Sequence, residues 1–279
     1  MAKLPPHIYH FAGSAAGPCV VVMGGVHGDE KVGVQVVEEM KKFLGKEKIC
    51  GEIYLIIGNP KAVKAGKRFI EYDLNRSFGY NLNDSTCEGK RAAQIAPFLG
   101  GADYLLDIHS TSKKSIPFVY CEGSKKHFGL AEILGTKYVV SPSSNYKKTV
   151  DGVCSDNFVD RNGGVGITYE CGWNKDNSLF DEAFLRTQQF LKATGVAFLE
   201  TPTCENVESP IHLQVHSKIV AESGDFIFDG EYDNFDFVKK GQKIATDGDT
   251  PVFAEKDSYI IFPKKSVAEG GVACLLACD

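Results

Sequence analysis

The stretch CVVVMGGVHGDEKVGVQVVEEMKKFL, residues 19–44, decides the fold class. It opens with CVVVMGG, a continuous apolar run of the length expected for a buried strand, and continues with the polar turn VHGDE. The rest, VGVQVVEEMKKFL, follows the pattern of a helix with one apolar face. A buried strand, a glycine-containing turn and an amphipathic helix together predict the first unit of an α/β domain.

Further strands and helices alternate as far as about residue 200. Strands are predicted at EIYLIIGNP (52–60) and ADYLLDIHS (102–110), with shorter ones at 117–120 and 164–170. Helices are predicted at 87–99 and 178–199. This alternation indicates a largely parallel or mixed central sheet that helices cover on both faces, which is an α/β/α sandwich.

The pattern changes after residue 200. The segment ETPTCENVESP (200–210) is polar, carries two prolines and has no clear period, which is typical of a linker. Short apolar pieces separated by glycine and aspartate turns follow it, among them HLQVHSKIVA (212–221) and GVACLLAC (271–278). The sequence therefore predicts two domains, an α/β domain at 1–200 and a small all-β domain at 201–279.

One segment of the second domain, FVKKGQKIATDG (237–248), resembles the hairpins of lipoyl and biotinyl carrier domains. A carrier needs a modifiable lysine at a tight exposed turn. No E-x-M-K-M-like context surrounds Lys239 or Lys240. The resemblance therefore concerns architecture, and carrier function is not expected.

Composition sets broad limits on the class of protein. The chain has 279 residues, 43% hydrophobic and 24% charged, as soluble globular proteins do. Its formal charge of -5 supplies no basic field, so a general nucleic-acid binder is not expected. No window approaches the ~20 apolar residues of a membrane span, and MAKLPPHIYHFAG has no signal-peptide core, so we expect a cytoplasmic protein. The nine cysteines form no C-x-x-C pair, which favours reduced thiols.

Three metal-binding residue types stand near the ends of two predicted strands. His27 and Glu30 lie in the turn after the first strand, and His109 ends ADYLLDIHS. A catalytic zinc site uses three protein ligands and leaves a fourth position open, and α/β folds bind ligands at the carboxyl ends of strands. An H-x-x-E pair also arises by chance, so on the residues alone metal binding and a structural role stay equally open.

Four motifs together extend this interpretation. GGVHGDE (24–30), YDLNRSFG (72–79), DIHS (107–110) and VGITYECG (165–172) resemble, in order and rough spacing, the succinylglutamate desuccinylase and aspartoacylase family, a branch of the zinc carboxypeptidase-like enzymes. The resemblance covers about residues 18–175 and extends to the C-terminal β domain. It implies a carboxypeptidase-like fold and one zinc per chain, held by His27, Glu30 and His109.

Amide hydrolysis needs a nucleophilic water and a proton donor for the departing nitrogen, and one carboxylate beside the metal can serve both steps. Glu170 ends an apolar strand and is a candidate for that carboxylate. A surface glutamate without a catalytic role could occupy the same position in the sequence pattern. The resemblance implies that Glu170 is the general base and acid. Cys171 has no evident histidine outside the metal site, so a cysteine nucleophile is not expected.

Arginine presents a planar fork that pairs with a carboxylate through two hydrogen bonds. The resemblance implies that Asn75 and Arg76 of D-L-N-R hold a substrate carboxylate and that Arg68 polarises the scissile carbonyl. Arg161 is the nearest match to a further carboxylate-binding arginine, at a spacing longer by one residue. Tyr259 matches a tyrosine by which the β domain reaches the active-site channel.

The sequence thus predicts a zinc-dependent hydrolase that cleaves the amide bond of a small N-acyl amino acid. Two alternatives stay open: a zinc carboxypeptidase that binds peptides in an open cleft, and a metal-binding protein without catalysis. The expected partner is a small molecule rather than a nucleic acid or a membrane. A homo-oligomer is compatible with the sequence.

Overall fold

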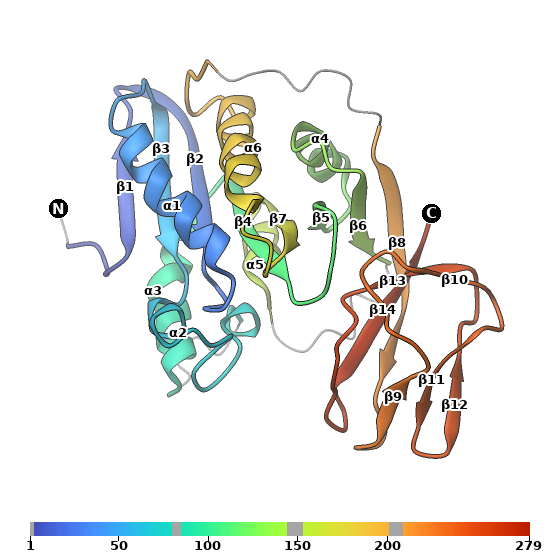
Figure 1. The fold of residues 1–279 in the computed structure, drawn as a ribbon. Helices are drawn as coiled ribbons and strands as arrows, with labels where there is room; N and C mark the ends of the chain where they lie inside the picture. Colours follow the sequence, from blue (N-terminus) through green and yellow to red (C-terminus); the bar gives the residue numbers. More distant parts are fainter. Residues whose placement is uncertain (1–2, 80–84, 144–152, 201–208) are drawn as a thin grey trace.

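The computed structural model describes residues 3–79, 85–143, 153–200 and 209–279 (Figure 1). Within them, eleven strands form one sheet in the order β1-β3-β2-β4-β7-β5-β6-β8-β14-β13-β10. The strands of its α/β part are β1 (Ile8–Ala12), β2 (Ala15–Gly24), β3 (Cys50–Ile57), β4 (Tyr104–Thr111), β5 (Phe118–Cys121), β6 (Tyr138–Pro142) and β7 (Val165–Trp173). The mixed sheet of the predicted α/β fold is confirmed.

The centre of the sheet is parallel. Strands β3, β2, β4 and β7 run in one direction, whereas β1 pairs antiparallel with β3 and β5 pairs antiparallel with β7. Parallel strands buried on both faces read as continuous apolar runs, which is why residues 19–24 contain almost no polar side chain. The carboxyl ends of β2, β4 and β7 consequently meet at one edge of the sheet.

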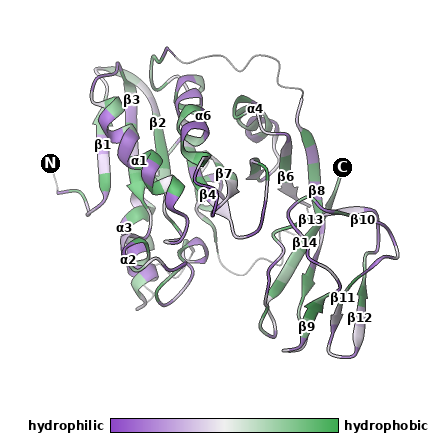
Figure 2. Cartoon of the chain, viewed as in Figure 1, coloured by the Kyte–Doolittle hydropathy of each residue, from purple (hydrophilic) through white to green (hydrophobic). Residues whose placement is uncertain are grey.

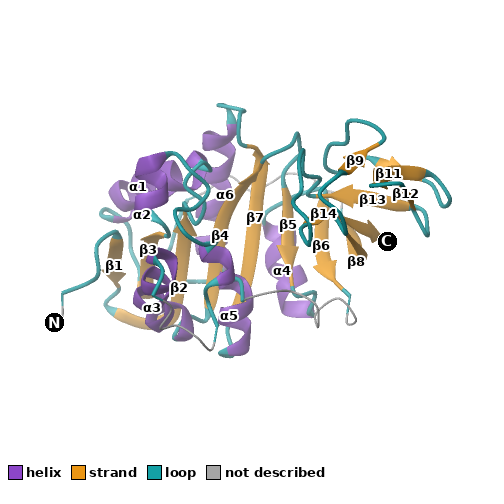
Figure 3. Cartoon of the chain, turned by 90° about the horizontal axis from the view of Figure 1, so that it is seen from below, coloured by secondary structure: helices purple, strands orange, loops and turns teal. Residues whose placement is uncertain are grey.

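Helices cover both faces, as expected for a three-layer sandwich. The helices are α1 (Lys31–Leu44), α2 (Pro60–Ala65), α3 (Cys87–Gly100), α4 (Lys125–Ile133), α5 (Ser155–Arg161) and α6 (Leu179–Ala193), with a 3-10 turn, η1, at Leu74–Arg76. Figure 3 places α1 and α6 on the opposite side of the strands from α3 and α5. In Figure 2 apolar and polar residues alternate along α1 and α6, as helices with one buried face require.

Side chains along β2 point alternately to the two faces of the sheet. They therefore contribute to two hydrophobic cores, one on each face. Val20 and Val22 pack with residues of α1 and α6, whereas Val21 and Met23 pack with residues of α3 and α5. All four side chains are fully buried. The sheet is therefore held from both sides at the strands that lead to the candidate site.

Four of the seven C-terminal strands, β8, β14, β13 and β10, continue the main sheet. The seven are β8 (Ile211–Val220), β9 (Phe226–Phe228), β10 (Phe237–Val238), β11 (Lys243–Asp247), β12 (Thr250–Phe253), β13 (Ser258–Ile261) and β14 (Val272–Cys278). Strand β8 pairs parallel with β6, and β9, β11 and β12 form a separate small sheet. No helix occurs in the described part of this region, which confirms the β-rich C-terminal domain. Most of the expected linker, 200–210, lies outside the described residues.

The helix predicted at 178–199 is shorter in the structure. It ends at Ala193 because Gly195 has a positive φ of 75°, and Ala197 then forms a bridge to Ile49. Sequence periodicity did not indicate the short elements β1, α2, α4, α5 and β6. None of the helices that the structure describes has the length and apolar character needed to span a bilayer.

Candidate metal centre and active site

The turn after β2 brings His27 and Glu30 to the edge of the sheet. Glu30 is the residue before α1, and its backbone amide donates to the carbonyl of His27 at 3.3 Å. Gly28 is required between them, because a Cβ there would lie 2.0 Å from the backbone carbon of Ala62. The turn is thus packed directly against α2, which fixes both candidate ligands.

Glu30 lies between two imidazole rings. Its Oε1 is 2.7 Å from Nδ1 of His27, and its Oε2 is 3.0 Å from Nδ1 of His109. The two rings meet edge to face with centroids 5.0 Å apart. All three side chains are buried, and Oε2 of Glu30 also accepts a hydrogen bond from the backbone amide of Ser110. The three predicted ligands therefore form one cluster with their Nδ1 and carboxylate atoms turned inward.

The outer nitrogen of each imidazole faces a second carboxylate. Nε2 of His27 lies 3.0 Å from Oδ1 of Asp73, and Nε2 of His109 lies 3.1 Å from Oδ2 of Asp107. Such carboxylates fix the histidine tautomer with a proton on Nε2, which leaves the Nδ1 lone pair free to bind a metal. The hydroxyl of Ser155 in turn donates to Asp107.

The cluster also has the charge that a cation requires. Burial alone would raise the pKa of Glu30, but the neighbouring His27 and His109 hold that pKa well below its usual range. Burial alone would lower the pKa of His109, whereas Asp107 and Glu30 raise it well above its usual value. Two imidazoles are thus surrounded by three carboxylates, and the site favours positive charge.

The donor set fits a divalent metal. One ligand atom from each of His27, Glu30 and His109 can be chosen so that all lie within 4.8 Å of one another. Two imidazoles and one carboxylate, each buried and turned toward a common centre, are a set found at catalytic zinc sites. The group can therefore hold a metal ion.

Glu170 lies in β7 directly beside His109 of β4 in the register of the sheet. It is 7% exposed, and its Oε2 has no hydrogen-bond partner in the described part of the chain. Burial raises the pKa of Glu170 to about 7. A buried carboxyl group beside the cluster, with one unpaired oxygen and a pKa raised to about 7, has the properties of a general base and acid.

The D-L-N-R motif forms the 3-10 turn η1, which Asp73 caps. The Asp73 carboxylate accepts the backbone amide of Asn75 at 2.8 Å while it contacts His27. The side-chain oxygen of Asn75 accepts the backbone amide of Ser155, and Nη1 of Arg76 donates to the carbonyl of Asn75 and to Sγ of Cys154. One aspartate therefore ties the two predicted carboxylate anchors to the metal cluster.

Arg68 reaches the cluster from the loop before η1. Its Nη1 donates to Oε1 of Glu30 at 3.2 Å, and its Nη2 lies 3.9 Å from Oδ2 of Asp73. The side chain is 48% exposed, so its outer edge is open to solvent. The structure thus brings seven of the nine predicted site residues together. They are His27, Glu30, Arg68, Asn75, Arg76, His109 and Glu170.

The two remaining predicted site residues are Arg161 and Tyr259. Arg161 is the last residue of α5 and is exposed, and it immediately precedes the turn into the amino end of β7, whereas Glu170 lies near the carboxyl end of that strand. The structure therefore does not bring Arg161 to the cluster. Tyr259 lies in β13, where its ring packs 5.8 Å from Tyr138 and 5.2 Å from Phe237.

Sequence reasoning missed the residues that surround the cluster. Asp107 and His109 are two apart on a strand and so share a face, a signal that could have identified Asp107 as the carboxylate behind the histidine. Lys264 had no such signal. Burial, and then the positive charges of Arg68 and Arg76, lower the pKa of Lys264, so this lysine of the C-terminal region is close enough to feel those charges.

Two aromatic residues of the C-terminal region were also missed. Phe235 and Phe262 both have positive φ values, 70° and 53°, which bulky residues rarely adopt. Their rings pack 5.0 and 5.5 Å from the ring of Phe118, the residue paired with Glu170 across β5 and β7. The β-rich region thus covers the strand beside the candidate base.

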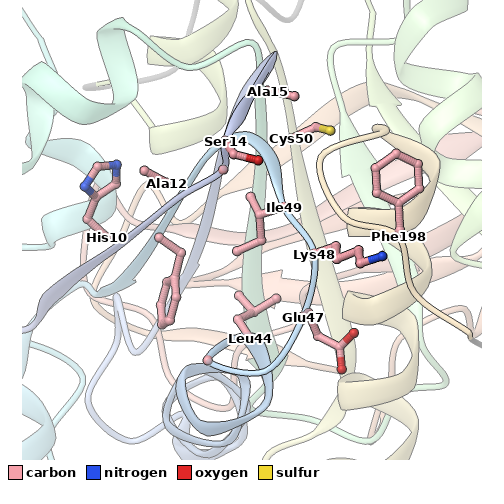
Figure 4. A pocket seen from close by; sticks show the side chains of 13 residues that line it. His10, Ala12, Ser14, Ala15, Leu44, Glu47, Lys48, Ile49, Cys50 and Phe198 are labelled. Atoms are coloured by element: carbon pink, nitrogen blue, oxygen red, sulfur yellow. The ribbon is translucent and has the colours of Figure 1, made fainter.

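A hollow of about 660 Å³ lies at the opposite edge of the sheet (Figure 4). It is lined by the amino ends of β2 and β3 and by Phe198, and it includes Ser14, Glu47 and Cys50. None of the candidate site residues lines it. The hollow is therefore separate from the group formed by His27, Glu30 and His109.

Comparison with known proteins identifies the family. The model of the succinylglutamate desuccinylase/aspartoacylase catalytic domain matches residues 16–194. The model of the AstE/AspA barrel-sandwich hybrid domain matches residues 211–279. The chain belongs to the succinylglutamate desuccinylase/aspartoacylase family, as its motifs predicted.

Individual relatives agree with this membership. The chain is 24% identical over 283 residues to a succinylglutamate desuccinylase of Vibrio campbellii, which spans 93% of this chain and 80% of that protein. It is 43% identical over 103 residues to a protein of Nostoc named "Probable aspartoacylase", which covers 33% of this chain and 35% of the relative.

Solved structures share the fold. A succinylglutamate desuccinylase from Vibrio cholerae superposes with a TM-score of 0.80 at 20% identity, covering 98% of this chain and 85% of the other. A succinylglutamate desuccinylase/aspartoacylase from Rhodobacter sphaeroides gives a TM-score of 0.76 at 22% identity, covering 98% and 89%.

Proposed function

We propose that this chain is a zinc-dependent hydrolase that cleaves the amide bond of a small N-acyl amino acid. The observation that carries the proposal is the buried His27, Glu30 and His109 cluster with the unpaired carboxyl of Glu170 beside it. Family membership supports it, because the relatives are named for the removal of acyl groups from amino acids.

The proposed metal is a single zinc per chain held by His27, Glu30 and His109. When bound there, zinc supplies a Lewis acid that polarises the acyl carbonyl and makes water more acidic. Asp73 and Asp107 hold the two imidazoles in the orientation that binds it.

Glu170 is the proposed general base and acid. Its carboxyl takes the proton from the attacking water and returns it to the amide nitrogen as the bond breaks. Its burial raises its pKa to about 7, which suits a group that must both accept and give a proton at neutral pH. Arg68, with its exposed outer edge beside Glu30, is positioned to stabilise the oxyanion that develops on the acyl carbonyl.

Asn75 and Arg76 are the proposed anchors for the substrate carboxylate. Both lie on η1, two and three residues after the Asp73 that contacts His27, so a carboxylate bound there would lie close to the metal cluster. Lys264 adds a cation from the C-terminal region on the same side. The positive charges of Arg68 and Arg76 act on Lys264, and together the three favour an anionic substrate. Tyr259, whose ring packs against Tyr138, is the proposed contact of the C-terminal region with the substrate. The position of Arg161 at the end of α5, before the amino end of β7, does not support a role in binding.

We propose the same division of labour between the two predicted domains. Residues 1–200 carry the metal cluster, the base and the anchors. Residues 201–279 narrow the entrance, because Phe235, Phe262 and Lys264 approach the site from this region. A narrowed entrance admits short acyl amino acids and excludes longer peptides.

A substrate panel tests the proposal. Zinc-loaded protein is assayed with N-acetyl and N-succinyl derivatives of acidic and neutral amino acids, beside tetrapeptides with free carboxyl ends. Hydrolysis of N-acetylaspartate or N-succinylglutamate, with tetrapeptides left intact, is the expected result. Efficient release of the C-terminal residue from tetrapeptides would replace the proposal with a carboxypeptidase. A zinc-loaded chain that cleaves nothing in the panel would favour a metal-binding protein without catalysis.

A further inference from the structure

The loop that carries Arg68 has little apolar packing of its own. Between α2 and η1 it runs without regular structure, and its apolar side chains point to solvent: Phe69 is 39% exposed, Ile70 42% and Tyr72 44%. A loop whose side chains are not buried must be held by polar contacts if it is to present Arg68, Asn75 and Arg76 in fixed positions.

Those contacts converge on one buried carboxylate, Glu88. It lies in the first turn of α3 and is fully buried. Its Oε1 accepts the backbone amide of Ile70 at 2.8 Å, and its Oε2 accepts the amides of Glu71 and Tyr72, both at 3.2 Å. Three consecutive amides of the loop therefore bind a single side chain.

The fourth donor to Glu88 links the loop to the metal cluster. Nδ2 of Asn59 donates to Oε1 of Glu88 at 3.0 Å, and Oδ1 of Asn59 caps α2. The backbone amide of Asn59 donates to the carbonyl of Gly25, two residues before His27. The backbone amide of Gly28 donates to the carbonyl of Arg68, so the turn that carries His27 is also bonded directly to the loop that carries Arg68.

The same end of α3 is fixed to this turn a second time. Nε of Arg91 donates to the carbonyl of Gly58, and its Nη2 donates to that of Ile57, both at 2.8 Å. These two hydrogen bonds attach the end of α3 that carries Glu88 to the turn between β3 and α2. Nearby Glu71 and Cys87 lie close enough to share a metal with Glu88. The oxygens of Glu88 are already engaged by four donors, which argues against that use.

The charge of Glu88 matches its contacts. Burial alone would raise the pKa of its carboxyl, but the hydrogen bonds from Ile70, Asn59 and the other amides keep that pKa below its usual value. Hydrogen bonds to an ionised acceptor are stronger than those between neutral groups. An anion that accepts four hydrogen bonds is therefore a firm anchor for the loop.

We infer that Glu88 is a positioning residue that holds the loop of Arg68, Asn75 and Arg76 in register with the metal cluster. This inference rests on the proposed function. Glu88 itself touches neither substrate nor metal, and it acts through the backbone of residues 70–72 and through Asn59. A displacement of about 1 Å in positioning groups can cost about 10²-fold in rate.

The test compares the zinc-loaded wild-type chain with Glu88→Gln and Glu88→Asp. The amide nitrogen of glutamine is a donor that would face backbone donors, whereas aspartate keeps the charge on a shorter side chain. We expect kcat/KM for the preferred acyl amino acid to fall by about 10²-fold in Glu88→Gln and by less in Glu88→Asp, with zinc content unchanged. Backbone amides 70–72 should exchange hydrogen faster in the same order. If Glu88→Gln does not fold, Glu88→Asp carries the test with its smaller loss.

A matched control separates positioning from general stability. Asp247 also accepts two backbone amides, from Glu222 at 2.6 Å and Ser223 at 3.0 Å, but it lies in the C-terminal strands. Asp247→Asn should leave kcat/KM unchanged. In an Arg76→Ala background, Glu88→Gln should cost less than in the wild type, because one group that it positions is already gone.

Two outcomes overturn the inference. One is unchanged kcat/KM with unchanged exchange at 70–72 in Glu88→Gln, and the other is an equal loss in Asp247→Asn. A wild-type chain that hydrolyses no acyl amino acid would instead overturn the proposed function, and amide exchange alone would then decide whether Glu88 holds the loop.

Discussion

Among single residues, Glu170 matters most to the proposed hydrolysis, because it is the proposed general base and acid. Glu170→Gln keeps the shape of the side chain but removes the base. We expect kcat to fall by at least about 10²-fold, the usual contribution of general acid–base catalysis. Zinc should stay bound, because Glu170 is not one of the three proposed ligands. Near-normal turnover in this variant would mean that another group moves the proton.

Arg76 tests substrate binding separately from proton transfer. Arg76→Ala removes a charge-assisted contact to the substrate carboxylate, so kcat/KM should fall by roughly 1.5–3 kcal/mol in free-energy terms. Arg76→Lys should recover little, since an ammonium lacks the planar fork. The matched substrate with a carboxamide in place of the carboxylate should be hydrolysed equally by wild type and variant. An equal loss on both substrates would rule out the anchor role.

The buried carboxyl of Asp156 should make the free energy of unfolding depend on pH. This buried carboxyl at the start of α5 accepts from Thr168 at 3.3 Å, and burial, with Asp160 and Asp107 nearby, raises its pKa to about 6. In the unfolded chain an aspartate titrates near pH 4. Between these values the folded state holds more protons, so this group lowers the free energy of unfolding as pH rises, and its effect levels off above pH 6.

Asp156→Asn removes this effect. Relative to wild type, the variant should gain stability between pH 4 and pH 7, by at most about 3 kcal/mol for a shift of this size. Urea unfolding of both chains at the two pH values measures the difference. A difference that does not change with pH would show that Asp156 titrates normally.

The same scale shows what sequence can predict about a site. His27, Glu30, His109 and Glu170 stand at strand ends in recognisable motifs, so their meeting could be predicted. Glu88 could not be identified in this way, because its role depends on which loop amides approach it, and no spacing encodes that. Arg161 shows the limit of transferring a role by approximate spacing, since one helix separates it from the edge where Glu170 lies.

At the scale of elements, the site depends on the close approach of α1 to the sheet. A Cβ on Gly33 would lie 2.7 Å from the carbonyl oxygen of Ile108 and 3.0 Å from Cα of Gly24. Gly33→Ala should therefore push α1 off the strands that carry the ligands, three residues from Glu30. We expect a stability loss of about 1–3 kcal/mol, typical of overpacking, together with weaker metal binding.

Gly129 in α4 provides the control, because a Cβ there meets nothing within 4 Å. Gly129→Ala should raise helix stability by up to about 1 kcal/mol and leave metal binding unchanged. The measurements are the thermal unfolding midpoint and the zinc affinity of Gly33→Ala and of Gly129→Ala, each compared with wild type. Equal behaviour of the two variants would show that the approach of α1 is not what fixes Glu30.

Elements with strong periodicity were predictable, and short ones were not. The buried run of β2 and the apolar face of α1 are local patterns that tertiary contacts reinforce. Helix α6 was predicted too long because the apolar residues Val196 and Ala197 continue the pattern past Gly195. In the structure Ala197 forms a bridge to Ile49, and the carbonyl of Val196 accepts the amide of Cys50. Strand β6 is only five residues long and is fixed by its neighbours β5 and β8.

At the scale of the whole molecule, the two predicted domains share one sheet. Strand β8 continues from β6, and Phe235 and Phe262 pack on Phe118 beside the candidate base. Sequence reasoning predicted the β-rich composition of this region from its short apolar pieces. It could not predict the shared sheet, because pairing between distant strands depends on contacts that no local pattern records.

In the proposed function, one zinc at His27, Glu30 and His109 makes this chain an acyl amino acid hydrolase. The most direct test removes metal with a chelator, returns zinc stepwise, and measures bound zinc and hydrolysis of the preferred acyl amino acid together. The account predicts no hydrolysis without metal, recovery in proportion to bound zinc, and saturation at one zinc per chain. The His27→Ala, His109→Ala double variant should bind none at this site. Full hydrolysis by the metal-free chain, or undiminished zinc binding in the double variant, would contradict it.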